Sequence, residues 1–268
     1  MRPIPLKQKN VLITGASSGI GKELAGCFAA EGANLFMGAL PTEKEALDAW
    51  AGELAARHGV ETHTLAVDLS VPKGPVAMHE AAVSAFGPVE VLVNNAGLLA
   101  YGEFAKIPLA RQRLMVDVNF SAYLSLMHLC LPDMIAARAG GVLNLVSASA
   151  LQPTPFHAVY GATKAGMLAL SLAVAAEVRR AGVRVTALCP SYVDTPLVRN
   201  EIPDSMHWFK ISGLATPAYI AAEGLAAFQK GRLVHVPGLK NRIIHQVLNP
   251  LMPKSLTGRL GARILGPR

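Results

Sequence analysis

Apolar residues follow two alternating patterns along the chain: short continuous runs and longer segments with helical spacing. The continuous runs are typical of strands buried on both faces of a sheet. They lie at Asn10–Thr14, Asn34–Gly38, Thr62–Val67, Val89–Asn94, Gly141–Ser147, Val183–Leu188 and Arg232–Val236. The first helical segment follows the turn after the first strand and ends at about Glu31. The others are Thr42–His58, Arg111–Ala137 and Val159–Arg180. This alternation predicts an α/β fold with a mostly parallel seven-stranded sheet flanked by helices.

One helix start has a recognisable sequence signal. Thr42 followed by Glu45 has the spacing of a capping box, which predicts that the helix through His58 begins there.

Composition narrows the class of protein. The chain has 268 residues, of which 51% are hydrophobic and 16% charged, which excludes a disordered chain and suits one large α/β domain. The three cysteines, Cys27, Cys130 and Cys189, are far apart, which favours a reducing, cytoplasmic location over a disulfide scaffold. No metal site is expected, since the histidines and cysteines lack ligand spacing.

The net charge of +7 is unevenly distributed. Glu223 is the last acidic residue, so the positive excess belongs to the C-terminal part of the chain. The rest is close to neutral, whereas a nucleic-acid enzyme would more often carry positive charge over its working face. We therefore expect no nucleic-acid partner. We predict a domain over residues 1–236 and a basic amphipathic arm over residues 237–268.

A glycine-rich turn joins the first strand to the first helix at Thr14–Gly21 (TGASSGIG). Gly15 permits the tight turn, Gly19 lets backbone amides approach a pyrophosphate, and Gly21 lets the helix pack closely on the strand. The N–H groups at the helix start favour anions, so the segment predicts dinucleotide binding. The residues assigned to this contact are Gly15, Ser17, Ser18, Gly19, Ile20 and Gly21.

Further motifs follow in order. Asn94–Gly97 reads NNAG after the fourth strand, and Asp68 follows the third. Tyr160 and Lys164 form YxxxK, with Ser147 thirteen residues before the tyrosine. Together with TGxxxGxG, these motifs resemble the short-chain dehydrogenase/reductase family from residue 14 to about residue 195. The resemblance implies a single Rossmann-like, doubly wound domain and an oxidoreductase that transfers hydride between nicotinamide and a ketone or secondary alcohol.

The resemblance also assigns site residues. It implies further cofactor contacts from Asp68, Leu69, Asn95, Ala96, Gly97, Tyr160, Lys164, Pro190, Val193 and Thr195. Tyr160 would be the general acid/base and Lys164, four residues later on one helix face, would lower its pKa and hold the ribose. Ser147 would donate a hydrogen bond to the substrate oxygen, and Asn119 would anchor a water that serves Lys164.

Two positions depart from the family pattern. Ser191 follows Pro190 where the family commonly has glycine, which stiffens the loop over the nicotinamide. The second strand ends at Ala39 without an acidic residue, and Ser18 is not basic, so neither usual signal for NAD or NADP is present. Because no carboxylate stands there to repel a 2′-phosphate, the sequence slightly favours NADP over NAD.

The substrate is expected to be a small lipophilic or aromatic molecule. Leu99, Ser149, Phe156 and Tyr192 are assigned to its pocket. The resemblance implies that residues 195–213 cover it. That segment lacks a dense basic cluster for a phosphate group.

Two alternatives stay open for the arm. Apolar residues of 241–252 and 255–265 recur at helical spacing beside arginines. The apolar face docks on protein with the cations in water, or it lies reversibly on a membrane surface.

The segments Arg111–Ala137 and Val159–Arg180 are apolar over more of their circumference than a sheet covers. They predict a homodimer or homotetramer.

Two other functions are compatible with the same fold: a non-catalytic dinucleotide-binding regulator and a membrane-surface scaffold. A regulator needs no proton-transfer pair, and a scaffold leaves the glycine turn unexplained, so the set Asn119, Ser147, Tyr160 and Lys164 favours the enzyme.

Overall fold

The computed structural model describes residues 4–202 and 213–266. Its centre is a seven-stranded sheet in the order β3-β2-β1-β4-β5-β6-β7, with every neighbouring pair parallel. The strands are β1 (Asn10–Thr14), β2 (Asn34–Ala39), β3 (Thr62–Ala66), β4 (Val91–Asn94), β5 (Gly141–Leu145), β6 (Arg184–Leu188) and β7 (Val234–His235). The predicted α/β fold and its parallel seven-stranded sheet are confirmed.

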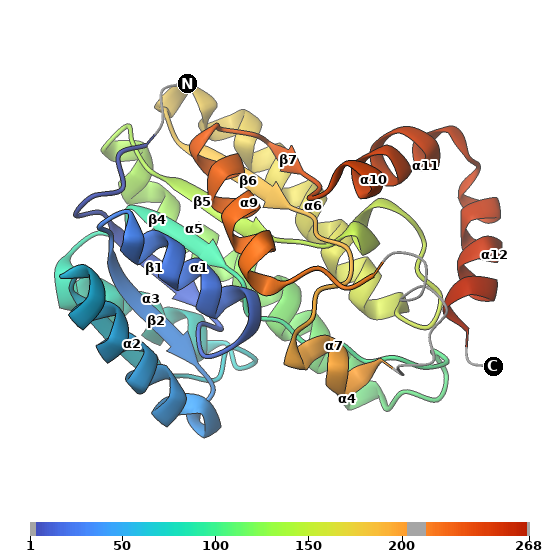
Figure 1. Cartoon of the computed structure of the whole chain (residues 1–268), viewed down its shortest axis with the longest axis horizontal. Helices are drawn as coiled ribbons and strands as arrows, with labels where there is room; N and C mark the ends of the chain where they lie inside the picture. The colour runs from blue at the N-terminus through green and yellow to red at the C-terminus, as the bar shows by residue number, and fades with distance from the viewer. Residues whose placement is uncertain (1–3, 203–212, 267–268) are drawn as a thin grey trace.

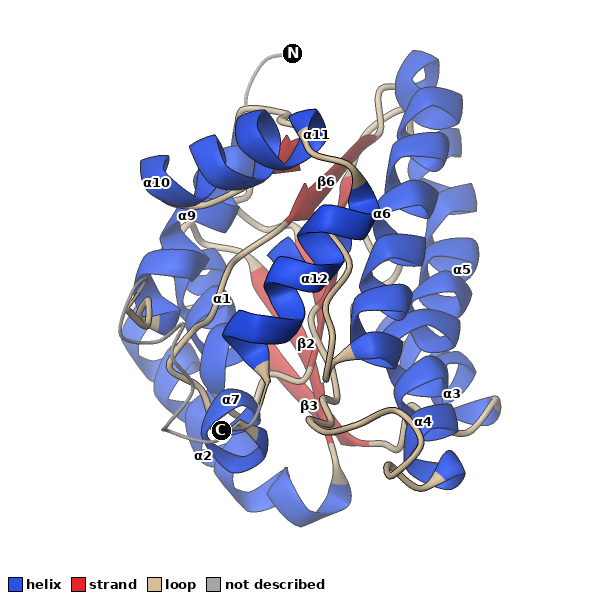
Figure 2. Cartoon of the chain, turned by 90° about the vertical axis from the view of Figure 1, so that its right-hand side faces the viewer, coloured by secondary structure: helices blue, strands red, loops and turns tan. Residues whose placement is uncertain are grey.

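Helices cover both faces of the sheet, so its strands are buried on both sides (Figures 1 and 2). One face packs on α1 (Gly19–Ala30), α2 (Lys44–His58) and α9 (Pro217–Gln229), with Phe28 and Phe228 in the shared core. The other packs on α3 (Lys73–Phe86), α5 (Ala122–Ala136) and α6 (Ala158–Val178), around Tyr123.

The long helix predicted over Arg111–Ala137 consists of three parts. The helix α4 (Leu109–Val116) leads through a π-helical turn, η2 (Asp117–Ser121), into α5. Asn119 lies in that turn, and π-helical turns are frequent at functional sites. The helices α3, α7 (Pro196–Glu201) and α9 were not predicted.

The predicted capping box at Thr42 and Glu45 is wrong. A 3-10 turn, η1 (Pro41–Glu43), precedes α2, and the residue that caps α2 is Glu43, whose side chain makes no capping hydrogen bond. Its carboxylate instead accepts a hydrogen bond from Ser17 Oγ at 2.7 Å. A contact with the glycine-rich turn therefore replaces the local cap.

The sheet has a switch point between β1 and β4. The chain runs outward from β1 through β2 to β3, then returns to β4 on the other side of β1 and continues to β7. Ligands of such sheets bind in the crevice at the carboxyl ends of the two strands that flank the reversal.

The C-terminal arm contains α10 (Leu239–Arg242), a π-helical turn η5 (Ile243–Leu248), α11 (Asn249–Leu251) and α12 (Lys254–Leu265). It stands apart from the helical layers and curves back on the chain's own domain (Figure 1). Tyr101 donates a hydrogen bond from its hydroxyl to the Leu265 carbonyl at 2.6 Å, and Lys254 Nζ donates to the Leu151 carbonyl at 3.2 Å.

The arm packs on protein, as one of the two alternatives held. In α12 the predicted apolar residues Ile264 and Leu265 pack inward, but residues 243–251 do not dock through their predicted apolar face. The apolar residues Ile243, Val247 and Leu251 are 45%, 53% and 79% exposed. The inward side of the same segment carries His245 of η5 and Asn249 of α11, each 3% exposed. The expectation that apolar spacing identifies the docked face is therefore wrong for this segment.

Candidate active site

The glycine-rich turn is packed so closely that side chains are excluded. Gly15 has a φ of +64°, and a Cβ there would lie 2.9 Å from Ala96 Cα. A Cβ on Gly21 would lie 2.1 Å from the Gly15 carbonyl oxygen. The backbone therefore meets the start of α1 without intervening side chains, as close binding of a pyrophosphate requires.

The NNAG motif holds β1 and β4 together at the switch point. Asn95 Nδ2 donates to the carbonyls of Thr14 and Gly15 at 2.9 Å each. Thr14 Oγ1 in turn accepts from the backbone N–H groups of Asn95 and Ala96 at 2.8 and 2.9 Å. These hydrogen bonds hold the NNAG segment against the start of the glycine-rich turn and so stabilise the crevice between them.

The crevice at the switch point contains a cavity of about 560 Å³. Eleven residues predicted for the cofactor line it: Gly15, Ser17, Ser18, Gly19, Ile20, Asp68, Leu69, Asn95, Ala96, Gly97 and Thr195. Ser18 makes no side-chain cap to α1, which leaves the first N–H groups of the helix available to an anion. The cradle and the helix start fit a dinucleotide.

Other predicted cofactor residues have supporting positions. Val193 is buried and forms a bridge with Ala215, which fixes the loop after β6. The Pro190 carbonyl accepts from Ala148 N at 2.8 Å. Gly21 packs behind the turn. The sequence also gave no sign that Glu43 would line this cavity.

The four predicted catalytic residues lie around the ends of β4 and β5. Lys164 is buried, and its Nζ donates to the Leu145 carbonyl at 2.8 Å and lies 5.7 Å from the centre of the Tyr160 ring. Asn119 pairs with the Leu98 backbone, accepting at 2.7 Å and donating at 2.8 Å. Asn119 thereby holds the loop that follows NNAG.

Burial is the largest influence on the pKa values of Tyr160 and Lys164. It raises the pKa of Tyr160, while a side-chain hydrogen bond with Ser147 lowers it. Burial also lowers the pKa of Lys164 to about 7. The predicted lowering of the Tyr160 pKa by Lys164 stays a prediction.

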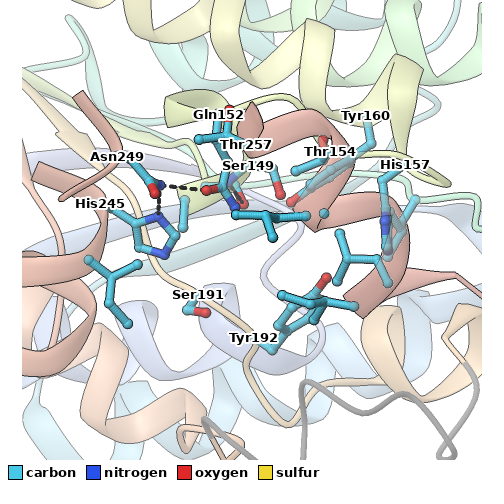
Figure 3. Close-up of a pocket in the computed structure, with 18 of the residues that line it drawn as sticks. Ser149, Gln152, Thr154, His157, Tyr160, Ser191, Tyr192, His245, Asn249 and Thr257 are labelled. Carbon is cyan, nitrogen blue, oxygen red and sulfur yellow. Dashed lines mark hydrogen bonds between the residues drawn. The ribbon is translucent and has the colours of Figure 1, made fainter. Parts of the chain in front are cut away.

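A second cavity of about 230 Å³ adjoins the phenol of Tyr160 (Figure 3). Its lining includes Ser147, Tyr160 and three of the four predicted substrate residues, Leu99, Ser149 and Tyr192. Phe156 instead packs beside Tyr101, with ring centres 6.0 Å apart, outside the lining. Residues 203–212 of the predicted covering segment lie outside the described residues.

The sequence did not predict that the arm would build one wall of this cavity. Arm residues in the lining are Ile244, His245, Asn249, Met252, Thr257, Leu260, Gly261, Ile264 and Leu265. Leu197 lines both cavities, so the site of the predicted dinucleotide and that of the predicted substrate meet.

Fold and site together define a nicotinamide-dependent oxidoreductase of the doubly wound class. The sequence model of the short chain dehydrogenase family matches residues 9–205. The chain belongs to that family, and it is an NAD(P)-dependent enzyme that acts on hydroxyl and carbonyl groups.

Known relatives cover most of the chain. A 2,3-dihydroxy-2,3-dihydro-p-cumate dehydrogenase of Pseudomonas putida is 30% identical over 248 residues, covering 88% of this chain and 95% of its own. A solved structure of a 7β-hydroxysteroid dehydrogenase has a TM-score of 0.84 at 26% identity, covering 97% and 99% of the two chains. A Sphingobium yanoikuyae short-chain dehydrogenase in complex with NADPH has a TM-score of 0.81 at 28% identity, covering 91% and 93%.

Proposed function

We propose that this enzyme interconverts a lipophilic or aromatic ketone and its secondary alcohol, with Tyr160 as general acid/base. The observation that carries the proposal is the cavity that Tyr160 and Ser147 line together with Leu197, Val198 and Ile264. Such a wall favours a substrate whose main part is apolar, while the hydroxyl groups of Tyr160 and Ser147 can both hydrogen-bond to one substrate oxygen. The hydroxysteroid dehydrogenase neighbour is named for a bulky alcohol of this class.

Each of the four catalytic candidates has a separate role around the substrate oxygen. Ser147 Oγ accepts from Ser149 N at 3.1 Å, which leaves its own proton to donate. Tyr160 gives the proton to the oxygen during reduction and takes it during oxidation. Asn119 fixes the loop that follows NNAG, and Lys164 places its amino group beside the Tyr160 ring. A bound nicotinamide supplies or accepts the hydride.

A panel of ketones tests the function. With NADPH or NADH present, we expect bulky lipophilic and aromatic ketones to be reduced with higher kcat/KM than short polar ones, measured by loss of cofactor absorbance. If the protein binds the dinucleotide but turns over no ketone or alcohol, the result would favour the alternative function, a non-catalytic dinucleotide-binding regulator.

Cofactor choice depends on charge at the end of β2. The sequence-based preference for NADP is slight, and Glu43 brings a carboxylate into the cofactor cavity. We expect Ala39→Asp to shift the ratio of kcat/KM values toward NAD, because a carboxylate accepts from a 2′-hydroxyl and repels a 2′-phosphate. Glu43→Gln should shift the ratio toward NADP by severalfold. Glu53→Gln on the exposed side of α2 is the control, and equal ratios in all variants would refute this assignment.

We also propose a homodimer or homotetramer formed through α5 and α6. In the most apolar stretches of the helical segments Leu109–Ala136 and Ala158–Ala181, 39% and 33% of the residues are buried. Leu124 and Leu172 are 44% and 38% exposed. Light scattering at micromolar concentration should show an oligomer, which Leu124→Glu with Leu172→Glu dissociates. Leu233→Glu, at a 42% exposed site, should leave it intact.

The outer face of the arm combines exposed apolar residues with cations. Leu239, Val247 and Leu251 are exposed, and so are Arg259 and Arg263. This composition suits an anionic membrane surface, where lipophilic substrates collect. We therefore propose a cytoplasmic enzyme with reversible membrane contact; failure to sediment with anionic liposomes at low salt would refute the contact.

A further inference from the structure

A polar cluster interrupts the apolar wall at the arm side of the substrate cavity. His245 and Asn249 come from the arm, and Gln152 comes from the loop after β5 (Figure 3). Asn249 Nδ2 donates to Gln152 Oε1 and lies 3.1 Å from His245 Nδ1. All three side chains line the cavity.

The hydrogen bonds fix which histidine nitrogen carries the proton. The Asn249 amide has two N–H groups, so it serves Gln152 Oε1 with one and His245 Nδ1 with the other. Burial lowers the pKa of His245, which keeps the ring neutral. With Nδ1 accepting, the single proton of a neutral ring is on Nε2.

That N–H group is buried without a partner. Within residues 4–202 and 213–266, His245 Nε2 makes no hydrogen bond. Buried polar groups in proteins are nearly always satisfied, so an unpartnered donor on a side chain that lines a cavity is available to a bound molecule.

The orientation of the arm strengthens this argument. Residues 243–249 expose Val247 and Leu248, at 53% and 49%, and bury His245 and Asn249, while Ile244 also lines the cavity. Burial of apolar surface alone would favour the opposite arrangement. A polar contribution to the cavity explains why the polar side faces inward.

We propose that His245 Nε2–H donates a hydrogen bond to a second oxygen of the substrate, a carbonyl or hydroxyl remote from the reacting carbon at Tyr160. Figure 3 shows His245 and Tyr160 on opposite sides of the cavity, with Ser149, Thr154 and Thr257 between them in this view. A neutral imidazole in an apolar wall offers one N–H and no positive charge, so it suits a neutral oxygen better than a carboxylate. The substrate class is therefore a lipophilic hydroxyketone or diketone. This inference rests on the proposed function.

The test uses fused-ring ketones carrying a hydroxyl at successive remote positions, each paired with the same ketone lacking it. For at least one position, the unmodified enzyme should prefer the hydroxyketone about tenfold in kcat/KM, mainly through KM, because the bond forms away from the reacting centre. His245→Phe should reduce that ratio to about one while retaining activity on the plain ketone. His245→Gln, which restores an N–H donor, should recover part of the ratio, and Gln246→Ala, at an exposed neighbour, should retain all of it.

The outcomes separate the two proposals. Plain ketones reduced with no preference at any position, or a preference unchanged in His245→Phe, would overturn the subsite and leave the proposed function standing. No reduction of any ketone in the series by the unmodified enzyme would overturn the proposed function and the subsite with it. Activity of His245→Phe on plain ketones shows that the variant has folded.

Discussion

Tyr160→Phe is expected to lower kcat by at least about a hundredfold, the scale of general acid–base catalysis, with dinucleotide affinity nearly unchanged. The substitution removes only the phenolic hydroxyl that faces the substrate cavity beside Ser147. Single-turnover reduction of a ketone measures the loss, and fluorescence titration with the reduced cofactor measures the affinity.

The matched control is Tyr192→Phe, which removes the same group from another tyrosine of the same cavity. We expect this control to lose less than about fivefold, because Tyr160, and not Tyr192, lies four residues before Lys164 on α6 and is the tyrosine assigned as general acid/base. Near-normal turnover by Tyr160→Phe would refute the assignment of the general acid/base.

A chain that ends after Leu239 should lose roughly thirtyfold to a hundredfold in kcat/KM for a bulky lipophilic ketone. The deletion removes the arm wall of the substrate cavity, including Leu260, Ile264 and Leu265, and loss of such apolar contacts costs about 2–3 kcal/mol. The loss should fall mainly on KM. Sedimentation with anionic liposomes should disappear in the same variant.

Dinucleotide affinity is the internal control for this deletion, since the arm contributes no residue to the described lining of the cofactor cavity. A chain that ends at Gly266 should behave like the full chain. Unchanged KM for bulky ketones in the long deletion would show that the arm does not form the substrate wall in solution.

Several features followed from the sequence because neighbours along the chain determine them. The turn at Gly15 and Gly21 needs glycine for local steric reasons, and Tyr160 and Lys164 share a helix face through their spacing. The strand runs gave the parallel sheet, since their apolar character reflects burial on both faces.

Contacts between residues far apart in the sequence appear only in the folded chain. Glu43 and Ser17 are hydrogen-bonded although 26 positions separate them in the sequence, and Asn249 and Gln152 are hydrogen-bonded although 97 positions separate them. No local sequence pattern could therefore reveal either contact. The apolar pattern and the motifs were enough to predict the fold, the glycine-rich turn and the spacing of Tyr160 and Lys164 on one helix. The apolar pattern misjudged this part of the arm because apolar spacing identifies the inward face only where the interior is apolar. Over residues 243–251 the inward side faces a cavity lined by both polar and apolar side chains, and His245 and Asn249 are buried there while Val247 and Leu251 are exposed.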